Sequence, residues 1–215
     1  GWDIAARWRP ARQVGGDFYD VFTLPDGRLG LVIADVADKG IPAALFMTLT
    51  RTLVRATVQQ EVSPAAVLGQ VNNLLVSDMQ NGMFVTIVYA VLSQKTGELV
   101  YTNAGHNLPL LVRHPSLKVT RLPKCGMALG VEANIPIAEH RFRIKPGDSI
   151  VFYTDGVTEA FAPDGSMYSE KRLHHTIREA NISSAMDLLN AIDHSVDEFT
   201  EDEFLSDDLT LVVLK

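Results

Sequence analysis

The sequence has one cysteine, Cys125, and no long hydrophobic run. A single cysteine excludes an intramolecular disulfide and favours a reducing compartment, so we expect a cytoplasmic protein. The apolar runs are much shorter than the roughly 20 residues that span a bilayer, and no signal-peptide pattern occurs, so we expect no membrane contact by this chain. The sequence also lacks a GxxxxGK[ST] loop and any His/Cys spacing typical of zinc sites, which argues against P-loop nucleotide chemistry and zinc binding.

Positive charge is scarcer than negative charge. The chain has 19 Lys and Arg residues against 26 Asp and Glu residues, a formal net charge of −7, and eight of the acids lie between Asp193 and Asp208. This charge would repel a phosphate backbone, so we expect no nucleic-acid partner and a cationic cofactor or partner instead. Within the acidic stretch, residues 193–203 are most simply a solvated helix face, and docking of a basic partner is the alternative.

The length of 215 residues, without a linker rich in Pro, Gly or Ser, predicts a single domain over residues 1–215. An apolar fraction of 47% is ordinary for a globular protein. The chain begins at Gly1 beside a strand-like run and not at a methionine. We therefore expect a domain excised from a longer protein.

Hydrophobic periodicity predicts a mixture of strands and helices. Apolar runs and period-two alternation predict strands over residues 3–10, 16–24, 28–36, 83–92, 98–104, 108–113, 119–122, 137–144, 148–155 and 208–215. Helical spacing predicts a helix pair between Gly40 and about residue 80, with Ser63 capping the second helix ahead of Pro64, and further helices over 171–180 and 185–199. Because runs of strands are separated by helices, we expect an α+β fold of stacked antiparallel sheets with helices outside.

Acidic residues stand at the ends of several predicted strands. Residues 25–27 (PDG) are a tight-turn signal, and a hairpin closed there brings Asp17 and Asp35 opposite each other at its open end. Asp155 follows another apolar run, and Asp207 precedes the last one. Any one of these acids is most simply a turn former. Together, however, they would repel one another unless a cation is bound, and carboxylates favour Mg²⁺ or Mn²⁺ over zinc.

Several stretches resemble successive motifs of one enzyme family. In chain order they are RPARQVGGDFYD, LVIADVADKGIPAALFM, TNAGHNLPLLVR, GDSIVFYTDGVTEA and SDDLTLVVL. They are similar to motifs of the SpoIIE/RsbU-like bacterial branch of the PPM (type 2C) metal-dependent protein serine/threonine phosphatases, over nearly the whole chain. The resemblance implies a PPM-phosphatase-like αββα sandwich, in which two central, mostly antiparallel β-sheets are flanked by helix pairs. It also implies two divalent cations, Mn²⁺ or Mg²⁺, at one edge.

The resemblance further implies roles for individual residues. Asp35 would bridge both metal ions, Asp17 and the backbone carbonyl of Val36 would complete one site, and Asp155 with Asp207 would hold the other. Two such ions about 3.5–4 Å apart generate a water nucleophile near neutral pH, which attacks the phosphorus in line. These acids would therefore be catalytic through the metal-activated water, with no covalent enzyme intermediate.

The motifs contain further candidates. Arg12, five residues before Asp17, is a candidate phosphate-binding residue by resemblance, with an ordinary surface arginine as the equal alternative. Asp208 is a candidate substitute ligand for its neighbour Asp207, which the family pattern favours. His106 belongs to a family motif, where hydrogen bonding to a turn is a simpler role than proton transfer.

By resemblance we expect a metal-dependent protein serine/threonine phosphatase acting on a STAS-type anti-sigma factor antagonist, in bacterial stress signalling by partner switching. We also expect an upstream sensor or regulatory domain in the same chain, with the helix pair over residues 40–80 as the candidate switch element, and a homodimer stays open. The alternative is a pseudo-phosphatase or scaffold that binds a phosphorylated partner without turnover. GGDFYD also resembles the GGDEF signature of diguanylate cyclases, but only 14 residues precede it, and the later acids would be unexplained.

Overall fold

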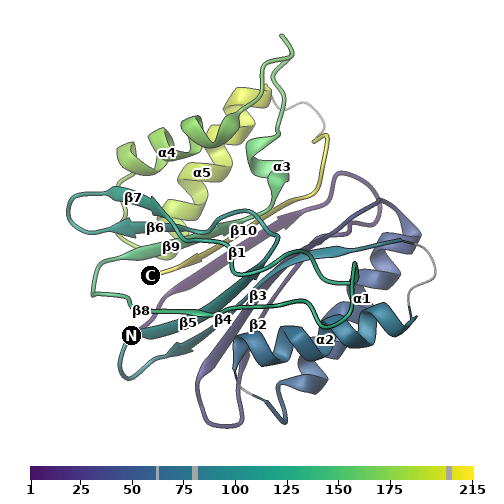
Figure 1. The fold of residues 1–215 in the computed structure, drawn as a ribbon. Helices are drawn as coiled ribbons and strands as arrows, with labels where there is room; N and C mark the ends of the chain where they lie inside the picture. The colour runs from purple at the N-terminus through teal and green to yellow at the C-terminus, as the bar shows by residue number, and fades with distance from the viewer. Residues whose placement is uncertain (62, 79–81, 202–204) are drawn as a thin grey trace. The chain divides into compact units, whose positions relative to one another are not determined.

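The computed structural model describes residues 1–61, 63–78, 82–201 and 205–215, and Figure 1 shows its fold. Its contacts group the chain into two compact units. Unit 1 comprises Gly1–Gln13, Asn107–Leu122 and Lys145–Lys215, and unit 2 comprises Val14–His106 and Pro123–Ile144. Each unit is built from separate stretches of sequence, so the units are not successive domains along the chain. A single catalytic domain over residues 1–215 stays a prediction.

Unit 1 contains an antiparallel sheet with the strand order β1-β10-β9-β6-β7. Its strands are β1 (Ile4–Arg9), β6 (Leu110–Arg113), β7 (Lys118–Arg121), β9 (Ser149–Tyr153) and β10 (Leu209–Leu214). Its helices are α3 (Asp155–Thr158), α4 (Ser169–Glu179) and α5 (Ala185–Thr200). The apolar sides of α4 and α5 share one buried cluster with β9 and β10, which forms the core of this unit.

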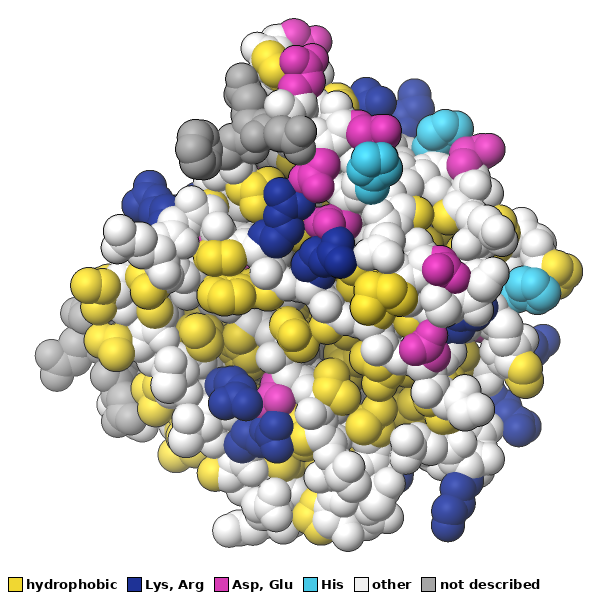
Figure 2. All heavy atoms as spheres, turned by 180° about the vertical axis from the view of Figure 1, so that it is seen from behind, with side chains coloured by type: hydrophobic (Ala, Val, Ile, Leu, Met, Phe, Trp, Pro, Cys, Tyr) yellow, Lys and Arg dark blue, Asp and Glu magenta, His cyan; other side chains and the backbone are white. Residues whose placement is uncertain are grey.

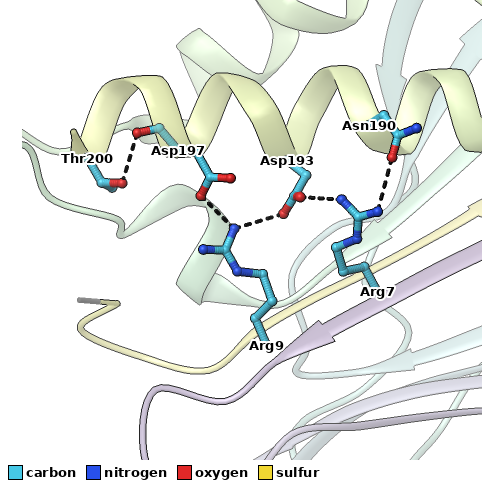
Figure 3. A network of polar contacts seen from close by, with 6 residues as sticks. All are labelled: Arg7, Arg9, Asn190, Asp193, Asp197 and Thr200. Carbon is cyan, nitrogen blue, oxygen red and sulfur yellow. Dashed lines mark hydrogen bonds and ion pairs between the residues drawn. The ribbon is translucent and has the colours of Figure 1, made fainter. Parts of the chain in front are cut away.

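Ion pairs join helix α5 to β1 at the edge of this sheet (Figure 3). Arg7 and Arg9 both bind Asp193, and Arg9 also binds Asp197 with an N–O distance of 2.6 Å. Asp193 is buried, so burial of its charge is compensated by the two guanidinium groups. The acidic stretch is thus more than the solvated helix face expected from the sequence, and part of it, residues 202–203, lies outside the described residues.

Unit 2 contains a second antiparallel sheet, with the strand order β2-β3-β4-β5-β8. Its strands are β2 (Phe18–Thr23), β3 (Leu29–Val36), β4 (Val85–Ser93), β5 (Glu98–Ala104) and β8 (His140–Arg143), and its helices are α1 (Ile41–Thr57) and α2 (Pro64–Asp78). The two helices pack as a pair (Figure 1). They share a buried apolar cluster with β2, β3 and β4. Ser63 caps α2, as predicted, because its Oγ accepts a hydrogen bond from the N–H of Ala66 at 3.3 Å.

Charged pairs also fasten α1 to β2. Asp20 is buried on β2, and its carboxylate accepts hydrogen bonds from Arg55 of α1 at 2.6 and 2.7 Å. The same carboxylate forms an ion pair with Arg51 of α1, with an N–O distance of 3.0 Å. On the face drawn in Figure 2, basic side chains likewise lie beside acidic ones. Arginine residues of this protein are therefore used in part to neutralise its own carboxylates.

Two antiparallel sheets with accompanying helices make this an α+β fold, and each predicted strand and helix is present. The sequence did not predict α3, a single turn that begins at Asp155, where the pattern favoured the end of a strand. No helix among the residues described here is both long and apolar enough to cross a bilayer.

Candidate functional site

Asp17 and Asp35 lie at the same end of the β2–β3 hairpin. In its antiparallel register Phe18 pairs with Ala34, which confirms the predicted hairpin, and the same register extended by one position sets Asp17 opposite Asp35. Asp17 is only 2% exposed, whereas Asp35 is half-buried. Unit 2 therefore presents two neighbouring carboxylates, one of them almost fully enclosed.

A backbone carbonyl lies beside this pair of acids. Val36 ends β3 and lies opposite Val85 of β4. The N–H of Val85 donates to the carbonyl of Leu129 at 3.0 Å, and its carbonyl accepts the N–H of Leu129 at 2.9 Å. The backbone groups of Val85 therefore point away from β3. Because backbone groups alternate in direction along an antiparallel ladder, the Val36 carbonyl points toward the β2 side. There a Cβ on Gly16 would lie 3.1 Å from the Val36 oxygen. The carbonyl thus borders the backbone that leads directly into Asp17.

The other two predicted ligands lie in unit 1. Asp155 is half-buried at the first position of α3, two residues after the end of β9, and the half-buried Asp207 lies two residues before β10. Gly156 lets these segments touch, because a Cβ at that position would overlap the carbonyl oxygen of Asp208 and lie 3.2 Å from that of Asp207. Unit 1 therefore also brings two acids and backbone carbonyls close together.

The two remaining candidates differ in their surroundings. Asp208 is 8% exposed, and its Oδ1 accepts a hydrogen bond from the N–H of Ala11 at 2.8 Å. Its own N–H donates to Oδ1 of Asp207 at 2.9 Å. The Asp208 carboxylate therefore helps to hold the segment that follows β1. Arg12, in the same segment of unit 1, has an exposed side chain.

His106 makes one contact through its backbone and one through its ring, and the ring contact, with β4, is one that the sequence did not predict. Its backbone N–H donates to Oδ1 of Asn103 at 2.8 Å. Its ring Nδ1 lies 2.8 Å from Oγ1 of Thr86, the residue of β4 that pairs with Asp35. Sequence reasoning missed Thr86, although its position across from Asp35 follows once β3 and β4 are recognised as neighbours.

The donor atoms fit a hard divalent cation. All the predicted ligands offer carboxylate or carbonyl oxygens, which Mg²⁺ and Mn²⁺ prefer. In the part of the chain that the structure describes, no group of three or more His, Cys, Asp or Glu side chains is close enough to hold an ion by itself. Mg²⁺, however, is commonly bound through one or two carboxylates and keeps several waters. Two acids beside backbone carbonyls, as in each unit, match that mode of binding.

Comparison with protein families identifies the chain. The family model for Stage II sporulation protein E (SpoIIE) matches residues 25–215. The matched part contains Asp35, Asp155 and Asp207, while Arg12 and Asp17 precede it.

Curated relatives include Protein IcfG of Synechocystis sp., which is 31% identical over 99% of this chain, and Phosphoserine phosphatase RsbU of Bacillus subtilis, which is 30% identical over 99%. The chain spans 38% of the length of IcfG and 63% of that of RsbU, less than two thirds of either.

Solved structures have the same fold. The structure of the RsbU and RsbW domains of Rv1364c from Mycobacterium tuberculosis is 26% identical with a TM-score of 0.80, and covers 100% of this chain and 60% of that one. The SiaA-PP2C domain of Pseudomonas aeruginosa, at 20% identity, has a TM-score of 0.84 over 99% of this chain and 85% of that one. The chain therefore belongs to the SpoIIE family, and its fold is that of the PP2C domain among these solved structures.

Proposed function

We propose that this domain is a metal-dependent protein phosphatase that hydrolyses phosphoserine or phosphothreonine in a protein substrate. The proposal depends on one observation: in each unit of this SpoIIE-family chain, two acids stand at strand ends beside backbone carbonyls. A relative that carries the name phosphoserine phosphatase supports the same activity.

Asp35 has the central role in the proposed mechanism. It sits on β3, which is paired on both sides by β2 and β4, so its backbone is rigid. Its carboxylate would bridge two ions, with Asp17 and the Val36 carbonyl completing one set of ligands and Asp155 with Asp207 forming the other. Two Mn²⁺ or Mg²⁺ ions, when bound, supply a water nucleophile near neutral pH and offset charge on the phosphoryl oxygens.

Asp207 is proposed as the ligand in preference to Asp208 because the family pattern of this motif favours it. Each of the two carboxylates accepts one backbone N–H, that of Asp208 at Asp207 and that of Ala11 at Asp208. Arg12 is proposed to bind the substrate phosphate, for which a planar guanidinium offers two parallel hydrogen bonds. Its exposed side chain is compatible with contact to a bound protein.

The substrate is proposed to be a phosphorylated STAS-type anti-sigma factor antagonist, within cytoplasmic partner-switching signalling. The protein in which RsbU and RsbW domains occur in one chain supports a pathway of this kind. An upstream sensor or regulatory domain is proposed to act on this domain through α1 and α2, and the two relatives described above are long enough to contain a further domain. A homodimer of the full-length protein is compatible with this arrangement.

The test measures phosphate release from phosphorylated STAS proteins and from p-nitrophenyl phosphate, with Mn²⁺ and with a chelator. Asp35→Asn and Asp155→Asn should each abolish turnover, because each removes a charged ligand. Asp164→Asn is the matched control: Asp164 is exposed, and its Oδ1 accepts a hydrogen bond from the backbone N–H of Ser166 at 2.8 Å within the same turn. This variant should keep the parent rate.

Near-normal turnover by both site variants would contradict the proposal. Tight binding of a phosphorylated protein, without phosphate release at any Mn²⁺ concentration, would instead indicate the pseudo-phosphatase or scaffold alternative.

A further inference from the structure

A line of polar contacts runs from Asp35 into the interior of unit 2. Asp35 on β3 pairs with Thr86 on β4. Oγ1 of Thr86 lies 3.4 Å from the carbonyl oxygen of Asp35 and 2.8 Å from Nδ1 of His106. Thr86 is half-buried like Asp35, whereas His106 is only 1% exposed. The Thr86 side chain, which neighbours the proposed bridging ligand Asp35, is thus in contact with the buried imidazole of His106.

The position of His106 is itself fixed. Its backbone N–H donates to Oδ1 of Asn103, the backbone carbonyl of Asn103 accepts the N–H of Cys125 at 2.9 Å, and the N–H of Gly105 donates to Gly126 at 3.1 Å. These bonds join the end of β5 to the segment at residues 125–126. The turn that carries the ring is therefore fixed by several hydrogen bonds, and the pairing of Ile87 with Ala104 holds it beside β4.

Proton counting decides how the contacts can coexist. A threonine hydroxyl has one proton to donate. If that proton points to the Asp35 carbonyl, Nδ1 of His106 must carry its own proton and donate to Thr86 Oγ1. If the hydroxyl instead donates to Nδ1, the 3.4 Å contact to the Asp35 carbonyl has no proton; in either arrangement the 2.8 Å contact joins the Thr86 hydroxyl to the imidazole.

We propose that Thr86 and His106 are positioning residues for the metal site, which set the geometry of Asp35 without touching the substrate or the ions. This inference rests on the proposed function, because it concerns the residue proposed to bridge the ions. Groups that orient metal ligands from behind typically change metal affinity by about 10- to 100-fold when they are removed. We expect a loss of that size when the Thr86 hydroxyl or the His106 ring is lost.

Thr86 allows the cleaner test, since Thr86→Val keeps the shape of the side chain and removes only the hydroxyl, while Thr86→Ser keeps the hydroxyl. For the histidine, His106→Ala removes the ring, and His106→Asn can return an N–H donor near the position of Nδ1. His175→Ala is the control, because His175 is exposed on α4.

The experiment measures direct Mn²⁺ binding without substrate, from the electron paramagnetic resonance signal of free Mn²⁺, at a temperature where circular dichroism shows each variant folded. Thr86→Val and His106→Ala should raise the Kd for Mn²⁺ by about 10- to 100-fold. Thr86→Ser, His106→Asn and His175→Ala should bind much like the parent. The double variant of Thr86→Val and His106→Ala should have a Kd for Mn²⁺ no higher than that of the weaker-binding single variant, because both changes interrupt the same line of contacts.

Parent-like Mn²⁺ binding by folded Thr86→Val overturns the inference, and so does a double variant whose loss is the sum of two independent losses. If His106→Ala does not fold, Thr86→Val and Thr86→Ser still decide. Asp35→Asn distinguishes failure of the proposed function from failure of the positioning role alone. If it binds Mn²⁺ like the parent, the proposed function fails and the inference fails with it. If it loses binding while Thr86→Val does not, only the inference fails.

Discussion

Gly156 offers a direct test of the way unit 1 brings Asp155 and Asp207 together. It lies in the right-handed turn of α3, where an alanine is allowed by the backbone but not by the space. A Cβ there would overlap the Asp208 carbonyl oxygen and come within 2.8 Å of the Asp208 carbonyl carbon. Both atoms belong to backbone, so Gly156→Ala can be accommodated only if the two segments separate.

The expected cost follows from this collision. Forcing an extra methyl group into a packed site costs about 1–3 kcal/mol of unfolding free energy. For a chain of this length, each kcal/mol lowers the midpoint of thermal unfolding by about 2–4 °C, so Gly156→Ala should lower it by about 2–12 °C. Because the same separation moves Asp155 away from the Asp207 segment, turnover and Mn²⁺ affinity should fall together.

Gly69→Ala is the matched control. Gly69 lies within α2, and a Cβ there meets no atom within 4 Å. Alanine is more favourable than glycine inside a helix by up to about 1 kcal/mol, so this variant should melt at a higher temperature than the parent. Differential scanning calorimetry of the three proteins gives the comparison. A Gly156→Ala midpoint equal to or above that of the parent would refute the argument from close backbone approach.

Two further predictions concern stability. Asn72 is fully buried; its Oδ1 accepts the N–H of Gly130 at 3.0 Å, and its Nδ2 donates to the carbonyl of Glu132 at 2.8 Å. Asn72→Ala should therefore lower the free energy of unfolding, measured in urea, by about 1–3 kcal/mol. Asn73 is an exposed neighbour, and an equal loss in Asn73→Ala would contradict burial as the reason. Burial raises the pKa of Asp148, but hydrogen bonds from backbone N–H groups and from Arg113 outweigh it and hold the pKa below 3.8. The ionised carboxylate therefore stabilises the fold above that pH. The loss of unfolding free energy in Asp148→Asn should be largest near neutral pH and should shrink as the pH falls below 3.8. A loss that does not change with pH would contradict a stabilising role of the ionised Asp148.

The sequence predicts those parts of the fold that local patterns encode. The PDG turn at residues 25–27 determines the hairpin register, and this alone brings Asp17 and Asp35 together. Ser63 before Pro64 marks the start of α2 because capping is a local interaction. In these places the residues that determine the structure are close neighbours in the sequence.

Contacts between distant segments are less accessible to such reasoning. The acids of α5 look like a solvated face until β1 is known to lie alongside with Arg7 and Arg9. Thr86 has no distinguishing local pattern, and its relation to Asp35 and His106 arises only when β3, β4 and the end of β5 are neighbours in the sheet. The grouping of the chain into two units from interleaved stretches is likewise invisible to composition and spacing.

The glycines beside the acids are recognised from the local sequence, but their role depends on contacts between distant segments. In the sequence, Gly16-Asp17 and Asp155-Gly156 are ordinary turn signals. In the structure, each glycine leaves out the side chain that would keep a backbone carbonyl away: that of Val36 in unit 2 and those of Asp207 and Asp208 in unit 1. Each glycine therefore raises the local density of oxygen atoms around a carboxylate, which repels further negative charge and favours a bound cation. This pairing distinguishes these acids from Asp164, which also stands beside a glycine but at an exposed turn where a Cβ on Gly165 would meet no atom within 4 Å.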